Sequence, residues 1–313
     1  MQTLAVVLQA PRQLELSRLS LLAAGEEDVV VDIAWSGIST GTERLLWSGT
    51  MPPFPGMGYP LVPGYESVGR VTTSGARSGR AVGDLVFVAG SKGFDGVRGL
   101  FGGAASRVVV PGQRAVPIDD SMAETGVLLA LAATAYHAIA GQGAQLPDLI
   151  IGHGVLGRLI ARMTVALGGP APVVWETSEL RRAGALGYAT MDPADDTRRD
   201  YRSICDVSGD SALLDTLIGR LAPRGEVVLA GFYSERLSFS FPPAFMREAR
   251  LRIAAEWQPA DLIATRDLIA AGRLSLDGLI THRSAAAQAD AAYRTAFGDP
   301  ACLKMVLDWR SCS

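Results

Sequence analysis

The sequence predicts an α/β protein of two domains, in which a β-barrel-type domain precedes a doubly wound parallel sheet. Three observations support this fold class. Short β-branched runs separated by glycine and proline fill roughly the first 120 residues. Strand and helix patterns then alternate, as they do in a parallel sheet covered by helices. A glycine-rich turn joins the first of these later strands to its helix.

The first domain is predicted from four apolar runs that end at turns, a pattern typical of antiparallel strands. They cover residues 28–33, 67–71, 84–88 and 106–110. Near Met122 the composition changes, and the alanine- and leucine-rich stretch 125–139 predicts a helix that leads into the second domain. We therefore expect a substrate domain over residues 1–122.

The second domain is predicted over residues 123–270 from alternating strands and helices. The expected strands cover 149–151, 173–175, 203–207 and 225–231, and the expected helices cover 156–167, 179–186, 212–221 and 259–271. Two further apolar stretches, 237–241 and 251–255, are expected as edge strands, which are common dimerisation surfaces. The strand-like stretch 303–307 predicts that a last segment, residues 271–313, returns to the first domain.

The turn at residues 152–157 has the spacing that a dinucleotide pyrophosphate requires in a Rossmann domain. Gly152 makes the tight turn, Gly154 lets the backbone approach the phosphates, and Gly157 lets the helix pack closely on the strand. The N–H groups and the positive dipole end of the following helix then face the anion. The expected cofactor contacts of this turn are Gly152, His153, Gly154, Val155, Leu156 and Gly157.

Glu176 follows the second expected strand of this domain. A carboxylate at that tip accepts hydrogen bonds from the adenosine ribose hydroxyls and repels a 2′-phosphate, so the sequence favours NAD over NADP. Against this interpretation, Arg181 and Arg182 follow closely, and the hydroxyls at 177 and 178 could also bind a phosphate. Asp206, near the end of a later strand, is predicted to belong to the same cofactor site.

Charge and composition exclude several classes of function. With 29 basic and 32 acidic residues the formal net charge is -3, which leaves no basic surface for nucleic acid. The first eight residues predict a strand and not a signal peptide, and no apolar run approaches the roughly 20 residues of a spanning helix. Three cysteines and three histidines show neither disulfide nor metal-ligand spacing. We expect a cytoplasmic protein that is not integral to a membrane.

Three further segments carry a family resemblance together with the glycine turn. Residues 36–43 (Ser-Gly-Ile-Ser-Thr-Gly-Thr-Glu), 63–69 (Pro-Gly-Tyr-Glu-Ser-Val-Gly) and 280–283 (Ile-Thr-His-Arg) resemble landmarks of the medium-chain dehydrogenase/reductase superfamily, in matching order and spacing. The resemblance implies a GroES-like domain in front of a Rossmann domain. It also implies that Thr42 is a proton-relay hydroxyl and that Thr134 touches the nicotinamide.

The chain departs from this superfamily at its zinc sites. Zinc-dependent members hold a catalytic zinc with Cys, His and a third Cys or carboxylate, whereas the corresponding positions here carry Thr40 or Ser39, Tyr65 and Ala130. Hydroxyls and a methyl group do not replace thiolate and imidazole, and the four-cysteine lobe of a structural zinc is absent. We therefore expect no metal. Glu66 is retained, either as a structural carboxylate or with a chemical role.

Among the zinc-free relatives, the chain resembles the dehydrogenases of bacteriochlorophyll synthesis, on residues 35–44, the Pro-Gly-Tyr-Glu variant, 152–154 and 174–177. This resemblance implies NAD-dependent oxidation of the 3-(1-hydroxyethyl) group of a bacteriochlorophyllide to 3-acetyl. The resemblance also implies that the segment 47–60 forms a wall of the substrate pocket and stacks on the tetrapyrrole. Without the resemblance, the segment would be interpreted as an ordinary proline-rich connection. The expected wall residues are Trp47, Met51, Phe54, Met57 and Tyr59, completed by Phe94 and Phe101.

Without a metal, oxidation of an alcohol needs a protein group that accepts the hydroxyl proton. Thr42 would pass this proton towards ribose or solvent, while Tyr65 would exchange it with the substrate oxygen or merely pack where the metal was. Glu43 could be a terminal base, although an ion pair with Arg44 is the more common arrangement. The candidate catalytic residues are Thr42, Tyr65, Glu66 and Ser39.

Two other functions stay open on the sequence alone. A zinc-free quinone or enone reductase shares the superfamily but normally prefers NADPH, and Glu176 argues against it. A nucleotide-binding protein without catalysis would keep the glycine turn and lose the substrate pocket, and Thr42 with the segment 47–60 argues against that. A homodimer is expected from the family alone.

Overall fold

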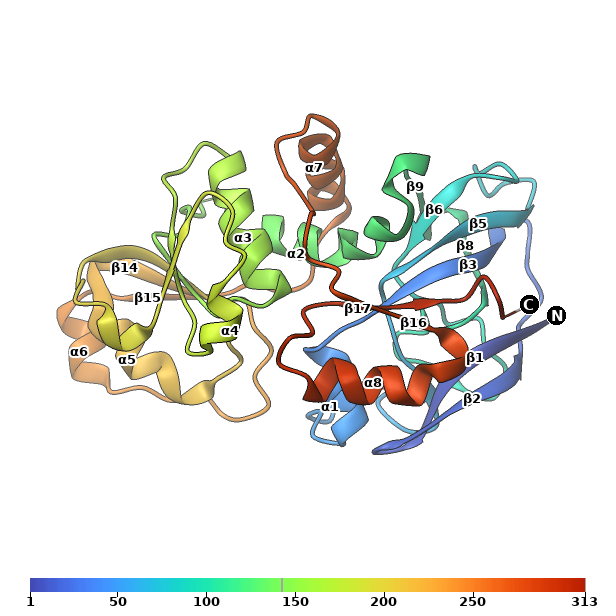
Figure 1. Ribbon diagram of the computed structural model, residues 1–313, viewed down its shortest axis with the longest axis horizontal. Coiled ribbons are helices and arrows are strands. Elements are labelled where there is room, and N and C mark those ends of the chain that lie inside the picture. The colour runs from blue at the N-terminus through green and yellow to red at the C-terminus, as the bar shows by residue number, and fades with distance from the viewer. Residues whose placement is uncertain (142, 313) are drawn as a thin grey trace. The chain divides into compact units, whose positions relative to one another are not determined.

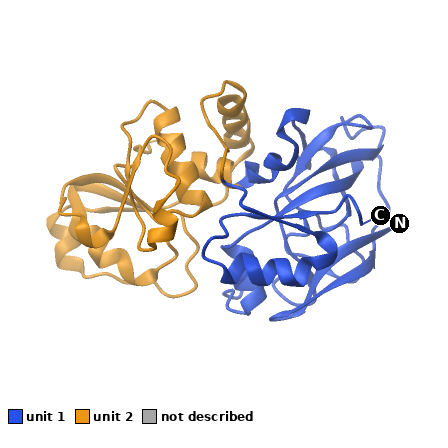
Figure 2. Ribbon diagram, viewed as in Figure 1, with its two compact units in different colours: residues 1–130, 279–313 blue, residues 131–278 orange. Residues whose placement is uncertain are grey.

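The computed structural model describes residues 1–141 and 143–312, and the chain divides into two compact units. Unit 1 comprises residues 1–130 and 279–313, and unit 2 comprises residues 131–278 (Figure 2). Unit 2 is therefore inserted between the two parts of unit 1. The expected boundaries after residues 122 and 270 each come eight residues before the observed ones.

Unit 1 is built on two mainly antiparallel sheets (Figure 1). One has the strand order β2-β1-β4-β7, and the other has the order β16-β17-β3-β5-β6-β9, with β8 also paired to β3. The strands are β1 (Gln2–Ala10), β2 (Gln13–Ser20), β3 (Asp28–Ile38), β4 (Leu61–Val62), β5 (Ser67–Ser74), β6 (Leu85–Val88), β7 (Arg98–Gly99), β8 (Arg107–Pro111), β9 (Ala115–Pro117), β16 (His282–Ala285) and β17 (Met305–Asp308). The helices α1 (Thr42–Ser48) and α8 (Ala289–Gly298) belong to the same unit.

Strand β3 is the centre of unit 1 because it pairs with β5, β8 and β17. Most of its residues are buried, as the β-branched run at its start predicts. Strand β17 comes from the far end of the chain and lies antiparallel to β3, with Met305 opposite Ile38. The carboxy-terminal segment therefore supplies a strand next to the loop that follows β3.

Unit 2 is a six-stranded sheet with the order β12-β11-β10-β13-β14-β15, in which every neighbouring pair is parallel. Counted from its own first strand, this order is 3-2-1-4-5-6, the doubly wound arrangement. The strands are β10 (Leu149–Ile151), β11 (Val173–Trp175), β12 (Ala189–Met191), β13 (Tyr201–Asp206), β14 (Leu221–Leu229) and β15 (Arg250–Ile253). The helices are α2 (Leu129–Ala140), which begins in unit 1, α3 (Val155–Ala166), α4 (Glu179–Arg182), α5 (Leu214–Arg220), α6 (Phe241–Met246) and α7 (Pro259–Ala270). The predicted fold class is confirmed.

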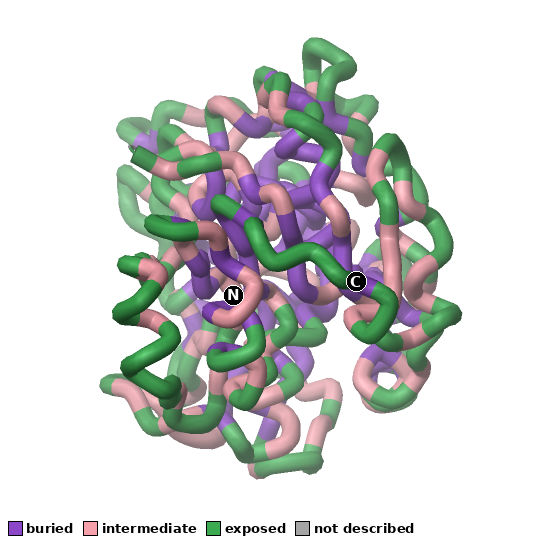
Figure 3. The backbone as a smooth tube through the Cα atoms, turned by 90° about the vertical axis from the view of Figure 1, so that its left-hand side faces the viewer, coloured by how far each residue is buried: buried purple, intermediate pink, exposed green. Residues whose placement is uncertain are grey.

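Local sequence explains how the glycine turn is placed. All three residues of β10 are apolar and buried, as expected for a central strand covered on both faces. In α3, the buried residues Leu159, Ile160 and Met163 recur at helical spacing. This helix ends before Gly168, which adopts a φ of 86° that other residues rarely adopt. Figure 3 shows buried residues towards the interior, whereas exposed residues lie on the outside, on loops and on some helical turns.

Several local predictions are wrong. Residues 237–241 form no strand, and α6 begins at Phe241 with prolines in its first turn. The expected helix 179–186 ends at Arg182, since Gly184 and Gly187 both have positive φ. Residues 120–128 form 3-10 turns ahead of α2, because the backbone of Ala123 is not helical.

The stretch Asp120–Ala140 is long and apolar enough to pass for a membrane span by length and composition. The expectation that no apolar run approaches this length is therefore wrong. However, 56% of its most apolar window is buried inside the protein, and Ala123, with a φ of 41°, interrupts the helical geometry. These features are typical of a core helix.

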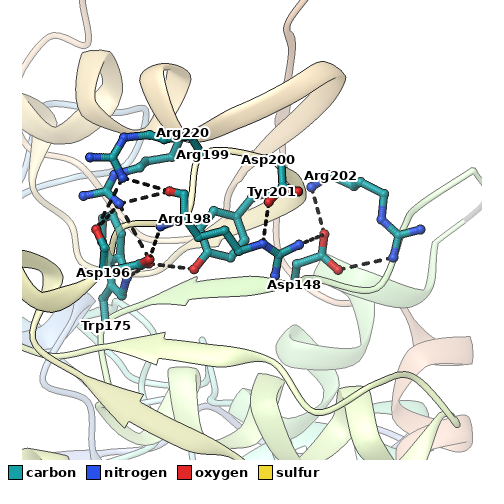
Figure 4. Close-up of polar contacts among 9 residues, drawn as sticks. All are labelled: Asp148, Trp175, Asp196, Arg198, Arg199, Asp200, Tyr201, Arg202 and Arg220. Atoms are coloured by element: carbon teal, nitrogen blue, oxygen red, sulfur yellow. Dashed lines mark hydrogen bonds and ion pairs between the residues drawn. The ribbon is translucent and has the colours of Figure 1, made fainter.

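A polar cluster takes the place of a crossover helix between β12 and β13 (Figure 4). Asp196 is 5% exposed, and its Oδ2 accepts hydrogen bonds from Trp175 Nε1 at 2.7 Å and from the Tyr201 hydroxyl at 2.6 Å. The Arg220 guanidinium lies 4.9 Å from the centre of the Trp175 ring. Because Trp175 ends β11, the cluster fixes the strand tip from which Glu176 extends.

Candidate active site and cofactor site

The glycine turn of unit 2 has the backbone geometry that a dinucleotide requires. Gly152 has a φ of 100°, and a Cβ on Gly157 would lie 1.9 Å from the carbonyl oxygen of Gly152. A Cβ on Gly154 would meet nothing within 4 Å, so the backbone there faces open space. Gly154 is also the N-cap of α3, whose first N–H groups have no partner within the helix. The turn therefore fits a pyrophosphate at the start of α3.

Glu176 is held against this turn by its carboxylate. Its Oε2 accepts the N–H of His153 at 3.2 Å, and its Oε1 accepts the N–H of Ser178 at 2.9 Å. Arg182 donates to the carbonyl oxygen of Glu176 at 3.0 Å and pairs with Asp192 at 3.0 Å. One of the two arginines that argued for NADP is thus engaged by its own chain.

His153 lies in the turn with its side chain fully buried. Its Nδ1 lies 2.6 Å from the carbonyl oxygen of Arg181, and its Nε2 lies 2.8 Å from the Tyr188 hydroxyl. A carbonyl only accepts, so Nδ1 carries the proton and Nε2 accepts from Tyr188. Burial lowers the pKa of His153 to about 4, so the ring is neutral at physiological pH.

Asp206 and Thr134 are also in unit 2. Asp206 lies opposite Ile151 in the β10–β13 register, which places it beside the glycine turn. It is 2% exposed, its Oδ1 accepts the N–H of Ser208 at 2.8 Å, and burial raises its pKa. Thr134 is half-buried on α2. Strand register thus brings Asp206 to the turn.

In unit 1, strand register gathers the candidate catalytic residues at the end of β3. Met305 opposite Ile38 brings Lys304 to this end, and Ser36 opposite Ser67 brings Glu66 there. Lys304 Nζ lies 2.6 Å from Glu66 Oε2 and donates to the carbonyl oxygen of Ile38 at 3.2 Å. Both charged side chains are at most 1% exposed. Glu66 is therefore one half of a buried ion pair.

The ion pair between Lys304 and Glu66 leaves no room for a side chain at position 37, which is a glycine. A Cβ at this position would lie 2.2 Å from Glu66 Oε2. The other carboxylate oxygen of Glu66 is buried and has no hydrogen-bond partner within the described part of the chain. Lys304 carries no motif and lies far along the chain, so sequence reasoning missed it.

Three hydroxyl groups meet beside the ion pair. Ser39 Oγ lies 2.6 Å from the Tyr65 hydroxyl, and the nearby hydroxyl of Thr42 acts to lower the pKa of that phenol. Burial, and then the negative charge of Glu66, raise the pKa of Tyr65 well above its usual value. Tyr65 therefore stays protonated and acts as a hydroxyl, not as a phenolate base.

The expected ion pair between Glu43 and Arg44 is wrong. Arg44 is exposed on α1, whereas Glu43 is fully buried on the inner side of that helix. Glu43 accepts the N–H of Ser39 at 3.0 Å and the Tyr293 hydroxyl at 2.7 Å. Burial raises its pKa to about 7, although these hydrogen bonds act in the opposite direction. Tyr293, on α8, is a second residue that sequence reasoning missed.

The expected substrate residues gather in one apolar cluster of unit 1, around Leu46 and Leu61. Phe101 packs edge-on against Tyr65, with ring centres 5.7 Å apart. Phe94 does not line this cluster, because it is 5% exposed in the separate core of the barrel. The five expected members that the cluster contains are Trp47, Met51, Phe54, Met57 and Tyr59.

The donor set at the superfamily's zinc position does not fit zinc. Thr40 is exposed, Tyr65 is hydrogen-bonded to Ser39, and Ala130 offers a methyl group. Among the described residues, no three or more His, Cys, Asp and Glu side chains are arranged to hold a metal ion. Zinc in proteins requires thiolate, imidazole or carboxylate ligands, which these positions lack.

Comparison with known proteins agrees with this architecture. Residues 25–120 match the family described as the alcohol dehydrogenase GroES-like domain. The chain is 58% identical over 311 residues to the 2-desacetyl-2-hydroxyethyl bacteriochlorophyllide A dehydrogenase of Rhodobacter capsulatus, and 59% identical over 316 residues to that of Cereibacter sphaeroides, with 99% of each chain covered in both cases. An Escherichia coli alcohol dehydrogenase solved with NADH is 19% identical and superposes with a TM-score of 0.83, over 98% of this chain and 99% of the other.

A GroES-like domain combined with a Rossmann sheet defines the class of medium-chain dehydrogenases/reductases. Within this superfamily of oxidoreductases, the chain belongs to the family of the 2-desacetyl-2-hydroxyethyl bacteriochlorophyllide A dehydrogenases. The resemblance inferred from the sequence is thereby confirmed.

The buried Glu43 predicts a pH dependence of stability. Its folded-state pKa of about 7 lies above the 4.5 of an unperturbed glutamate, so its contribution is full below pH 4.5 and is lost as the pH rises through 7. The Glu43→Gln variant lacks this titration. Between pH 5 and pH 8, the free energy of unfolding of the wild type should fall relative to the variant by roughly 2 to 3 kcal/mol, measured by urea denaturation. A difference that is flat or grows with pH would contradict the raised pKa.

Proposed function

We propose that the chain is a cytoplasmic, NAD-dependent and zinc-independent dehydrogenase that oxidises the 3-(1-hydroxyethyl) group of a bacteriochlorophyllide to 3-acetyl, in bacteriochlorophyll synthesis. The observation that carries this proposal is the identity of 58% and 59%, over 99% of the chain, to dehydrogenases named for that substrate. Three cysteines without disulfides are consistent with a reducing compartment.

The preference for NAD is supported by the surroundings of Glu176. Its carboxylate is anchored by the N–H groups of His153 and Ser178, at the strand tip where it can accept the ribose hydroxyls. Arg182 is committed to Asp192 and to main-chain oxygens and so offers little to a 2′-phosphate. NAD, when bound, supplies the hydride acceptor. The other residues proposed to hold it are the turn 152–157, Thr134 and Asp206.

Proton transfer is assigned to the hydroxyl cluster of unit 1. The alcohol loses hydride from carbon and a proton from oxygen, and conjugation of the new carbonyl with the macrocycle lowers the demand for activation. The phenol of Tyr65 donates a hydrogen bond to the substrate oxygen, and Thr42 passes the departing proton to solvent. Ser39 holds the phenol at 2.6 Å, while Glu66 positions the adjoining backbone through Lys304.

The apolar cluster of Trp47, Met51, Phe54, Met57 and Tyr59 suits a flat macrocycle. Aromatic faces and thioether sulfurs stack favourably on such a surface. Phe101 is 37% exposed and lies beside Tyr65, so it continues this apolar surface towards the hydroxyl cluster.

We also propose a homodimer formed by the edge strand β15. Ile253 is 74% exposed on this edge, and Leu251 is 40% exposed. Helix α6 adds Phe241, Phe245 and Met246, which are 65 to 76% exposed and line a hollow beside the strand. An unpaired apolar edge of this kind is a template for antiparallel pairing with a second copy.

The proposed reaction is tested by incubating the purified protein with NAD and 3-(1-hydroxyethyl) bacteriochlorophyllide a. We expect NADH to form together with a shift of the red absorption band, with kcat/KM roughly tenfold or more higher for NAD than for NADP. Because no metal is involved, prior treatment with a strong zinc chelator should leave the rate unchanged. Absence of the shift while NAD binds would refute the activity, and loss of the rate on chelation would refute zinc independence.

The relay is tested by Thr42→Val, which removes a hydroxyl with little change of shape. We expect kcat to fall by roughly 100-fold or more, because proton transfer loses its acceptor, while the Kd for NAD stays within about twofold. Tyr65→Phe should act in the same direction. The matched control is Thr73→Val on β5, an exposed position, which should behave as the wild type. Equal losses of kcat and of NAD affinity in Thr42→Val would contradict the relay.

The dimer is tested by placing a charge on the edge strand. Ile253→Asp should convert the dimer to a monomer in size-exclusion chromatography with light scattering, because a buried unpaired carboxylate costs several kcal/mol. Ile263→Asp on α7, at a position that is 58% exposed, is the control and should leave the mass unchanged. A wild-type protein that is monomeric at high concentration would rule out the proposal.

A further inference from the structure

Every polar atom of His153 makes a hydrogen bond, and most of these hydrogen bonds are made with the segment 176–188 that follows β11. The main-chain N–H donates to Glu176, and the carbonyl oxygen accepts Arg158 Nε at 3.0 Å. The ring nitrogens bond to the carbonyl oxygen of Arg181 at 2.6 Å and to the Tyr188 hydroxyl at 2.8 Å. The partners other than Arg158 lie within residues 176–188. A residue in the middle of the glycine turn therefore ties that turn to the segment after β11.

Arg158 makes a second connection between the same two parts of the chain. It is 4% exposed and lies in the first turn of α3. Its Nε binds the glycine turn at His153, while its two terminal nitrogens donate to the carbonyl oxygens of Arg181, Ala183 and Gly184 at 2.8 to 3.0 Å. Its guanidinium has no carboxylate within salt-bridge distance in the described part of the chain. The N–H groups of Arg158 therefore hold the main chain of residues 153 and 181–184 and do not neutralise a carboxylate.

Tyr188 is the third side chain that connects the glycine turn to the segment after β11. Its ring packs edge-on against the imidazole of His153, with centres 5.5 Å apart and planes at 84°. Gly184 packs against the Arg158 guanidinium, and it can do so because it lacks a side chain. A Cβ at this position would lie 2.6 Å from Arg158 Nη1. We call His153, Arg158 and Tyr188 the clasp.

We propose that the clasp determines the selectivity for NAD over NADP by holding residues 177–184 against the glycine turn. This inference rests on the proposed use of NAD. The held segment begins directly after Glu176 and contains Arg181 and Arg182, and Arg182 could meet a 2′-phosphate only by leaving Asp192 and its main-chain acceptors. To receive that phosphate the segment must move, and movement breaks the carbonyl contacts of Arg158 and His153. Arg158 and Tyr188 are assigned no contact with the cofactor, so they are positioning residues, whereas His153 belongs to the turn that is proposed to hold the cofactor.

The physical basis is the cost of buried polar groups. Moving residues 181–184 leaves a buried guanidinium and an imidazole N–H without acceptors, and such unmade hydrogen bonds are expensive. NAD requires no movement, because Glu176 already lies where the ribose hydroxyls are recognised. The clasp therefore penalises NADP binding and preserves NAD binding.

The test measures the affinity of the wild type and variants for ADP-ribose and for 2′-phospho-ADP-ribose by calorimetry. These probes carry the adenosine half alone, so they report on residues 176–184 without the reaction. In Arg158→Gln we expect the ratio of the two Kd values to shift towards the phosphorylated probe by roughly tenfold. The KM for NAD should rise while kcat at saturating NAD stays as in the wild type. Tyr188→Phe, which removes one hydroxyl, should shift the ratio in the same direction by a smaller factor.

The controls separate this proposal from general damage. Arg224→Gln changes an arginine whose side chain is 75% exposed and should leave the ratio unchanged. A variant that loses affinity for both probes by the same factor, or that lowers kcat equally, would show a structural role only and overturn the clasp. An unchanged ratio would also overturn it. If Arg158→Gln does not fold, Tyr188→Phe decides by the same criterion.

The wild type distinguishes failure of the clasp from failure of the cofactor proposal. A wild-type protein that binds the phosphorylated probe as well as ADP-ribose refutes the preference for NAD, and the clasp with it. A wild type that discriminates, beside variants that discriminate equally well, refutes only the clasp.

Discussion

The end of unit 1 that carries the candidate catalytic residues depends on the buried ion pair between Lys304 and Glu66. Removing two charges from water is costly, so such a pair persists only with good geometry and further hydrogen bonds. Lys304 meets this condition because it also donates to the carbonyl oxygen of Ile38, at the end of β3. Breaking the pair would leave an uncompensated buried charge. The pairing of β17 with β3 and the loop after β3 are thus fixed by the same ammonium group.

That constraint fixes the hydroxyl groups for which we propose a role without a metal. A zinc ion orients its ligands and polarises the substrate oxygen. In this chain Glu43 accepts the N–H of Ser39, and Lys304, paired with Glu66, binds the carbonyl oxygen of Ile38, so the backbone beside the Ser39–Tyr65 contact of 2.6 Å is held from both sides. Burial of Tyr65, and then the negative charge of Glu66, raise the pKa of the phenol and keep it protonated. The same surroundings that exclude a phenolate base therefore retain a hydrogen-bond donor, which we propose serves the substrate oxygen.

Sequence alone predicted the parts of the fold that depend on local pattern. The glycine turn, the strand before it and the tip at Glu176 follow from spacing, because each requirement lies within a few residues. Tyr293 and Lys304 could not be found in this way, since they join the site only through the pairing of strands and helices distant in sequence. The Glu43–Arg44 pairing failed because adjacent helical residues point in different directions. Residues 237–241 are apolar enough for a strand but have no neighbouring strand to pair with.

In each unit, a buried cationic side chain holds a loop of the candidate site through its main-chain carbonyl oxygens. In unit 1, Lys304 binds the carbonyl oxygen that precedes Ser39, and in unit 2, Arg158 binds the carbonyl oxygens of residues 181, 183 and 184. A buried cation suits this task, because it offers several donors from one side chain and main-chain oxygens are present in every loop. Main-chain acceptors also hold a loop whatever side chains it carries. A loop held in this way keeps its shape at the place where we propose that substrate or cofactor binds.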